Sequence, residues 1–128
     1  MRLFATFLLL GAVSLFGDPT WAESYDKAFA AAEKEHKGVM VMLSQKSCEA
    51  CWYMENIVLK DDELVVRLEK NFIPLYLDIN DDNIHGLAYI GTPTFYFKKS
   101  DGRTIKRVDG ALNIKDFADS LTEIEKSQ

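Results

Sequence analysis

The chain of 128 residues contains only two cysteines, Cys48 and Cys51. A small scaffold stapled by disulfides needs several bridges that close long loops, so this class of protein is excluded. A zinc site made of four cysteines of one chain is also excluded, because the chain has only two cysteines. A bridge between Cys48 and Cys51 would close a very short loop and would add little stability through loop entropy. We therefore expect the pair to matter for chemistry.

Positive charge is also scarce. The 15 lysines and arginines stand against 20 aspartates and glutamates, which gives a net charge of -5. A nucleic-acid-binding protein needs a basic face for phosphates, so we expect no nucleic acid among the partners. Charges of both signs are interspersed along the chain, which argues against disorder. The length allows one domain and leaves no room for a second core.

One long apolar run lies at the start of the chain. Residues 3–16 are almost all apolar or small and follow an arginine, a pattern typical of a secretory signal peptide. The run is shorter than the roughly 20 apolar residues that a membrane-spanning helix needs. Small residues favour cleavage after Ala22, so that 1–22 form the signal peptide and 23–128 the domain; cleavage after Gly17 is the alternative. We expect a periplasmic or otherwise exported protein, with an uncleaved anchor or a buried N-terminal helix as the other interpretation.

Four later segments have the apolar spacing of helices. They are residues 23–37, 48–59, 61–71 and 113–124. The first is expected to end at Lys37-Gly38, a cation followed by the glycine typical of a helix C-terminus. Asp61 and Asn113 belong to the residue types that cap helix N-termini. A short helical turn is expected at residues 85–90. The buried stripe of the last helix is expected to consist of Ile114, Phe117, Ala118, Leu121 and Ile124.

Four segments have the composition of strands, and they are residues 39–43, 72–79, 94–97 and 104–108. The first is wholly apolar, which is typical of a central strand buried on both faces. Helices connect the first two strands, so these should be parallel. A two-residue turn within Ser100–Arg103 should join the last two as an antiparallel hairpin. The pattern predicts an α/β fold with a mixed four-stranded central sheet and helices on both faces.

The segment Cys48-Glu49-Ala50-Cys51 lies between the first strand and a helix. Free N–H groups and the macrodipole at a helix N-terminus favour negative charge, so a Cys48 thiolate there would be the attacking form. Cys51 lies one turn further along and can attack a mixed disulfide at Cys48, which releases the substrate. We therefore predict Cys48 as nucleophile and Cys51 as resolving cysteine of a thiol–disulfide oxidoreductase. Its only redox group would be the disulfide itself, with no metal and no other cofactor.

Two alternatives stay open for the cysteine pair. Two thiolates at this spacing can form half of a zinc or copper site in a metal carrier, with His36, His85 or Met54 completing it. Surface positions are the commoner interpretation of the two histidines, and Met54 has the spacing of a core residue. The second alternative is a non-enzymatic binding or assembly factor on the same fold.

A further motif, Gly91-Thr92-Pro93-Thr94, precedes an aromatic strand. Proline lacks the N–H that a central strand needs, so Pro93 is unusual at this position. A cis Thr92–Pro93 bond in a tight turn would account for it, although trans is the commoner isomer.

The order and spacing of these motifs resemble the thioredoxin superfamily, and more narrowly exported thioredoxin-like proteins of the thiol:disulfide interchange type. The resemblance covers residues 21–125. It rests on Trp21, the Ala-rich first helix, Lys37, Cys48-x-x-Cys51 with Met54, Phe72, Asp78, Gly91-Thr92-Pro93-Thr94 and Gly110. It implies that Pro93 is cis and that Thr92 lies against the cysteines and offers backbone hydrogen bonds to a substrate. It also implies exported disulfide-containing substrates and a membrane electron donor. Without a dimerisation segment, we expect a monomer.

Three departures from the family pattern bear on activity. Ser47 stands where thioredoxins carry tryptophan, and Met42 falls where many bury an aspartate under the cysteines. Water, Glu49 or a substrate group would then have to accept the proton of Cys51. The dipeptide Glu49-Ala50 lacks the histidine or proline of many relatives. Glu49 disfavours a neighbouring thiolate, which makes the disulfide more stable and favours a reductase or isomerase role; a solvated carboxylate without such influence is the alternative.

Overall fold

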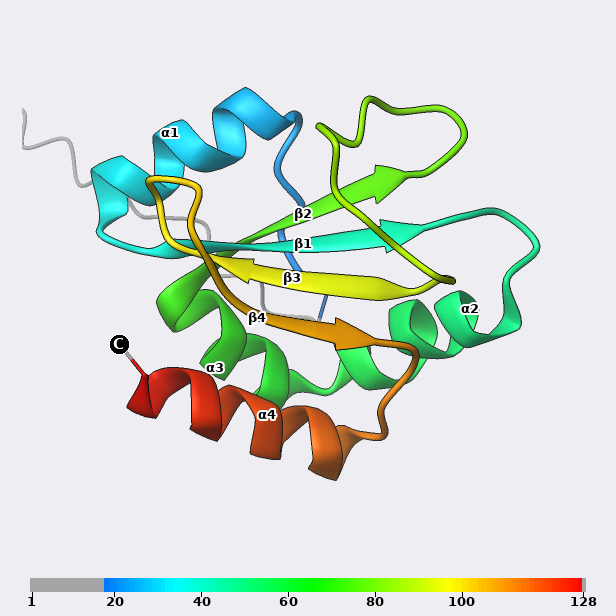
Figure 1. Ribbon diagram of the computed structural model, residues 1–128. Coiled ribbons are helices and arrows are strands. Elements are labelled where there is room, and N and C mark those ends of the chain that lie inside the picture. Colours follow the sequence, from blue (N-terminus) through cyan, green and yellow to red (C-terminus); the bar gives the residue numbers. More distant parts are fainter. Residues whose placement is uncertain (1–17, 128) are drawn as a thin grey trace, which may run out of the picture.

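Four strands form one mixed sheet in the order β2-β1-β3-β4 in the computed structural model, which describes residues 18–127 (Figure 1). The strands are β1 (Gly38–Ser44), β2 (Phe72–Asp78), β3 (Thr94–Lys98) and β4 (Thr104–Asp109). The helices are α1 (Tyr25–Glu35), α2 (Glu49–Asn56), α3 (Asp62–Asn71) and α4 (Ile114–Lys126), with a short 3₁₀ helix η1 (Val58–Lys60). The predicted mixed sheet is confirmed.

The strand β1 lies at the centre of the sheet. It runs parallel to β2 and antiparallel to β3, and β3 pairs antiparallel with β4. All seven residues of β1 are buried, as the apolar run predicts for a strand covered on both faces. The C-terminal end of β1 therefore leads directly out of the middle of the sheet toward α2.

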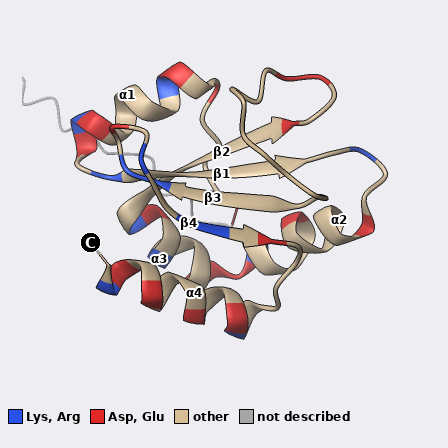
Figure 2. Cartoon of the chain, viewed as in Figure 1, with Lys and Arg blue, Asp and Glu red and all other residues tan. Residues whose placement is uncertain are grey.

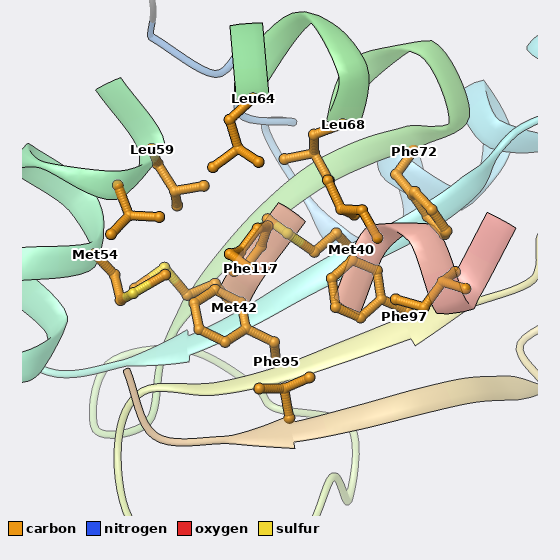
Figure 3. Close-up of a cluster of buried hydrophobic side chains, with 14 of the residues drawn as sticks. Met40, Met42, Met54, Leu59, Leu64, Leu68, Phe72, Phe95, Phe97 and Phe117 are labelled. Carbon is orange, nitrogen blue, oxygen red and sulfur yellow. The ribbon is translucent and has the colours of Figure 1, made fainter. Parts of the chain in front are cut away.

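Helices cover both faces of the sheet (Figure 1). On one face α1 packs through Ala28 and Ala32 against a core that includes Val41. On the other face, α2, α3 and α4 enclose a larger core. Figure 3 shows the side chains at its centre, among them Met40, Met42, Met54, Leu59, Leu64, Leu68, Phe72, Phe95, Phe97 and Phe117. The second face is the one on which α2, and with it the cysteine pair, rests.

The predicted caps are in place at two helices. Asp61 accepts a hydrogen bond from the Leu64 N–H at 2.9 Å, and Asn113 accepts one from the Asp116 N–H at 2.8 Å. The end of the first helix differs from the prediction. His36, with φ of 56°, takes the left-handed position at the end of α1, and Gly38 is already the first residue of β1. A Cβ at Gly38 would lie 2.3 Å from the Lys98 carbonyl oxygen, so the absence of a side chain at Gly38 allows β1 and β3 to pack closely here.

Three further predictions are wrong. Residues 85–90 form no helical turn; a turn at His85-Gly86 is followed by irregular backbone. The β3–β4 connection is longer than two residues, with Lys99 N–H bonded to the Arg103 carbonyl and a register shift between Phe97 and Lys98. Ile114 opens α4 but is 37% exposed, because it lies in the first turn beyond the edge of the core.

Charged residues of both signs lie interspersed over the helices and around the β3–β4 connection (Figure 2). The basic residues near that connection have acidic neighbours: Arg103 pairs with Asp101 at 2.8 Å, and Arg107 with Asp109 at 2.7 Å. Exposed pairs of this kind add little stability each. No helix within residues 18–127 is long and apolar enough to cross a membrane.

The segment before α1 packs against the domain. Pro19 is buried, the Thr20 N–H donates to the Glu69 carboxylate at 2.9 Å, and the Ala22 N–H donates to the Pro74 carbonyl at 2.8 Å. Trp21 lies against the larger core. Of the predicted signal peptide, residues 1–17 lie outside the described part of the chain, whereas 18–22 make these contacts. Cleavage after Ala22 would remove them.

Candidate redox site

The two cysteines meet at the N-terminus of α2. Cys48 is the N-cap residue, with extended backbone (φ -105°, ψ 109°), and its Sγ accepts a hydrogen bond from the Cys51 N–H at 3.1 Å. The two sulfurs form a disulfide, with the Cα atoms 5.2 Å apart. Cys48 is half-buried and Cys51 is 1% exposed. A sulfur at the N-cap faces the free N–H groups of the first turn, where negative charge is favoured.

The Thr92–Pro93 segment lies against Cys48, and its peptide bond is cis. The Thr92 hydroxyl donates a hydrogen bond to the Cys48 Sγ at 3.4 Å, and the Thr92 carbonyl oxygen lies 3.4 Å from the same sulfur. Pro93 is buried, and its carbonyl accepts a hydrogen bond from the Gly110 N–H at 2.9 Å. Thus the structure brings together residues 44 positions apart that the sequence singled out separately.

Glu49 and Ala50 occupy the first turn of α2. Glu49 is exposed and Ala50 is half-buried. Ser47, directly before Cys48, is exposed and has a left-handed backbone with φ of 61°. A small polar residue therefore stands beside the sulfur on the surface.

Met42 is fully buried in the core beneath α2. Its neighbour across the parallel pair is Tyr76, which is half-buried against the same core as Cys51. Burial raises the pKa of Tyr76 above its ordinary value; the Ser44 hydroxyl lowers this pKa, and the negative charge of Glu55 raises it. The pKa of Glu55 is also raised above its ordinary value. Burial of the carboxyl group is the larger cause, and a hydrogen bond with Tyr76 opposes it. A half-buried carboxyl group is therefore present on α2 itself, one turn after Cys51 and beside Tyr76 of β2, although Met42 does not supply one.

Of the three residues considered as further metal ligands, the two histidines lie outside the cluster around the cysteines, whereas Met54 lies on α2 in the same core as Cys51. His36 ends α1, and the His85 ring stacks on Tyr25 with centroids 3.7 Å apart. Met54 is fully buried, and its sulfur accepts a hydrogen bond from the Leu112 N–H at 3.4 Å. Among residues 18–127, no three His, Cys, Asp or Glu side chains gather as a metal-binding group.

Two features of the site were not predicted from the sequence pattern. Gln45 donates a hydrogen bond from Nε2 to the Thr92 hydroxyl at 2.9 Å, a contact between residues 47 positions apart. The cluster of Ser44, Glu55 and Tyr76 comes from three separate elements. None of these three residues stands out in the sequence of its own segment. The spacing of four positions between Cys51 and Glu55 places both on one helix face, and this was the one sequence feature that linked Glu55 to the site.

Comparison with known proteins agrees with this geometry. A family model described as a thioredoxin-like domain matches residues 25–125. A putative disulphide-isomerase from Bacteroides thetaiotaomicron is 21% identical, with a TM-score of 0.73 over 87% of this chain and 96% of that one. A thioredoxin from Thermus thermophilus is 26% identical, with a TM-score of 0.69 over 84% of each chain.

The periplasmic thioredoxin SoxS from Paracoccus pantotrophus is 18% identical, with a TM-score of 0.56 over 71% of this chain and 98% of that one. No curated protein sequence shows significant similarity to the chain. The match to the family model covers most of the chain: the protein belongs to the thioredoxin-like domain family, and its Cys48–Cys51 disulfide makes it a thiol–disulfide oxidoreductase.

Proposed function

We propose that the protein is exported and reduces or isomerises disulfides in exported proteins through the Cys48–Cys51 dithiol. The observation that carries this proposal is the position of Cys48: it caps α2, its sulfur accepts the Cys51 N–H, and it is the less buried of the two cysteines. A thiolate there is stabilised and reachable, whereas Cys51 is covered.

In the proposed reaction the Cys48 thiolate attacks one sulfur of a substrate disulfide. A bond forms between Cys48 and that sulfur, and the other substrate sulfur leaves as a thiolate. Cys51 then loses its proton to water, Glu49 or a substrate group and attacks the Cys48 sulfur. The Cys48–Cys51 bond forms, the substrate is released as a second thiolate, and two electrons have moved from the protein to the substrate. When a substrate thiolate attacks the mixed disulfide instead, the outcome is isomerisation.

Thr92 and Pro93 are the proposed substrate-binding residues. Their backbone lies against the Cys48 sulfur, so a peptide that carries the attacked disulfide has to pass beside them. Glu49, exposed in the first turn of α2, and Ala50 beside it are proposed to modulate the pair. A negative charge beside Cys48 disfavours the thiolate and thus favours a reducing disulfide.

Export is supported by the leader-like pattern of residues 1–22 and by the similarity to a periplasmic thioredoxin. An enzyme that reduces substrates in an oxidising compartment has to be reduced again, and we propose a membrane electron donor for this step. We propose that the protein acts as a monomer, since the cysteine pair and the Thr92 segment come from one chain.

Insulin reduction with dithiothreitol tests this function. The wild-type protein should accelerate the precipitation of insulin chains, and Cys48→Ser should abolish the acceleration. Cys51→Ser should lose turnover while retaining the ability to form a mixed disulfide. Equal behaviour of wild type and Cys48→Ser would contradict the enzymatic function and favour the non-enzymatic binding factor.

A redox titration against glutathione tests the direction of electron flow. We expect a more reducing potential than that of strong periplasmic oxidases, and we expect Glu49→Gln to make it less reducing. A strongly oxidising wild-type potential would contradict the reductase or isomerase role.

A further inference from the structure

A chain of two hydrogen bonds reaches the Cys48 sulfur from the loop that precedes it. Gln45 Nε2 donates to the Thr92 hydroxyl oxygen at 2.9 Å, and the same hydroxyl donates to the Cys48 Sγ at 3.4 Å. Gln45 and Thr92 are both half-buried. The thiol–disulfide exchange proposed above uses Thr92 only as a backbone surface, so it does not account for this link between side chains.

A threonine hydroxyl has one hydrogen and two lone pairs. When an amide N–H of Gln45 occupies one lone pair, the hydroxyl hydrogen has to point elsewhere, and the structure directs it at the sulfur. Without the amide, the hydroxyl can turn toward solvent or a carbonyl group. Gln45 therefore decides where the one hydrogen of Thr92 goes.

The direction of that hydrogen matters because Cys48 has opposing neighbours. The Thr92 hydroxyl and the Cys51 N–H, at 3.4 and 3.1 Å, are donors that stabilise a thiolate. The Thr92 carbonyl oxygen, 3.4 Å from the same sulfur, can accept a hydrogen bond from the neutral thiol and stabilise that form. Thr92 thus has two groups near the sulfur. Its carbonyl oxygen favours the neutral thiol, and its hydroxyl favours the reactive thiolate.

We propose that Gln45 is a positioning residue for the redox step: its amide holds the Thr92 hydroxyl with the hydrogen directed at the Cys48 sulfur. This inference rests on the proposed role of Cys48 as the attacking thiolate. The same hydrogen bond acts twice in the reaction. It stabilises Cys48 as the attacking thiolate. It also stabilises the negative charge on Cys48 when a substrate thiolate attacks the substrate sulfur of the mixed disulfide and Cys48 leaves.

The test is the pH dependence of Cys48 alkylation by iodoacetamide in the reduced full-length protein, followed on the Cys48 peptide by mass spectrometry between about pH 5 and pH 9. Gln45→Leu keeps a side chain of similar size and removes the amide. We expect it to raise the measured pKa of Cys48 by about 0.5. Gln45→Glu can only accept from the hydroxyl and adds a negative charge, so its increase should be larger.

Two variants of Thr92 separate positioning from a general effect of the loop. In a Thr92→Val background, which lacks the hydroxyl, Gln45→Leu should cause no further change. Thr92→Ser keeps a hydroxyl and should retain most of the dependence on Gln45. Circular dichroism and thermal unfolding of each variant show whether the fold is intact, so that an altered pKa is not mistaken for unfolding.

Three results would overturn the inference. The Cys48 pKa could be unchanged in Gln45→Leu, it could fall, or it could rise equally with and without the Thr92 hydroxyl. A fall would mean that the Gln45 amide presents its oxygen to Thr92 and draws the hydrogen away from the sulfur. Insulin reduction by the wild-type protein is measured separately, so failure of the proposed function and failure of this inference give different patterns.

Discussion

Trp21 lies edge-on against Tyr76, with ring centroids 5.9 Å apart and an angle of 77° between the ring planes. This contact ties the segment before α1 to β2, on the face that carries the redox site. Trp21 precedes the cleavage position that the sequence pattern favours, so cleavage there would remove this contact from the domain.

Removing Trp21 should destabilise the domain. A fully buried tryptophan costs about 3–5 kcal/mol when cut to alanine, and for the half-buried Trp21 we expect about 2 kcal/mol. Urea unfolding followed by circular dichroism measures the loss. Trp52, 60% exposed on α2, is the matched control, and Trp52→Ala should change the free energy of unfolding by less than about 0.5 kcal/mol.

A chain that starts at residue 23 should show at least the loss of Trp21→Ala, relative to one that starts at residue 18. Equal stability of the two chains would mean that the contacts of residues 18–22 contribute nothing to the fold. It would also mean that cleavage after Ala22, which the sequence pattern favours, costs the domain no stability.

Gly38 should not accept a side chain. A Cβ there would lie 2.3 Å from the Lys98 carbonyl oxygen and 2.8 Å from the Phe72 ring, so backbone would have to move. We expect Gly38→Ala to lower the free energy of unfolding by about 1–3 kcal/mol. Gly91→Ala, which meets nothing within 4 Å, should leave stability almost unchanged. Similar thermal unfolding of the two variants would contradict this packing argument.

Glu55 should reduce stability at neutral pH. Burial raises the pKa of Glu55 in the folded protein above its value in the unfolded chain, so the folded state binds the proton more tightly. The contribution of Glu55 to the free energy of unfolding is most favourable below about pH 4, and it is lost as the pH rises through the pKa of Glu55 in the folded protein. Glu55→Gln should therefore be more stable than wild type at pH 7, and the difference should shrink toward pH 4.

Urea unfolding at both pH values measures the effect of Glu55. Glu33→Gln, at an exposed position on α1, is the control and should show no such gain. A stabilisation by Glu55→Gln that is independent of pH would show that the carboxylate charge is not its cause.

Met42→Asp places the carboxylate common in thioredoxins into a site that is 0% exposed and apolar. A buried charge without a partner is costly, so we expect a loss of more than about 3 kcal/mol at pH 7 and a smaller loss at pH 4, where the carboxyl group can hold its proton. Met42→Leu should cost less than about 1.5 kcal/mol. If Asp and Leu at this position gave equal stability at pH 7, the core here would have to contain an unrecognised partner for the charge.

The sequence was sufficient for the elements whose signals are local. The apolar run at Val39–Leu43 predicted the central strand, and Asp61 and Asn113 predicted two helix starts. The order of strand and helix around the cysteines predicted Cys48 at a helix N-terminus, where the structure has it as the N-cap. In each case the residues that form the sequence pattern are the same residues that form the strand or the helix N-terminus. The cysteine pair was accessible to sequence reasoning for this reason.

Two features that the sequence pattern missed, the role of Gly38 and the link from Gln45, depend on contacts between distant residues. Gly38 is needed because Lys98 and Phe72 approach it, whereas the left-handed position at the end of α1 belongs to His36. The link from Gln45 to Thr92 spans 47 positions, and neither segment alone shows that a hydrogen bond forms. Such relationships depend on the packing of the sheet, which a local pattern does not contain.

The central claim, that Cys48 is the attacking thiolate, is tested most directly by alkylation of the reduced protein. The protein is treated with less than one equivalent of iodoacetamide near pH 7 and digested, and the modified cysteine is identified by mass spectrometry. The position of Cys48 at the start of α2, half-exposed beside the Thr92 hydroxyl and the Cys51 N–H, predicts that the label is found on Cys48 and that Cys51 stays unmodified. Labelling of Cys51 first, or of both cysteines equally, would contradict it.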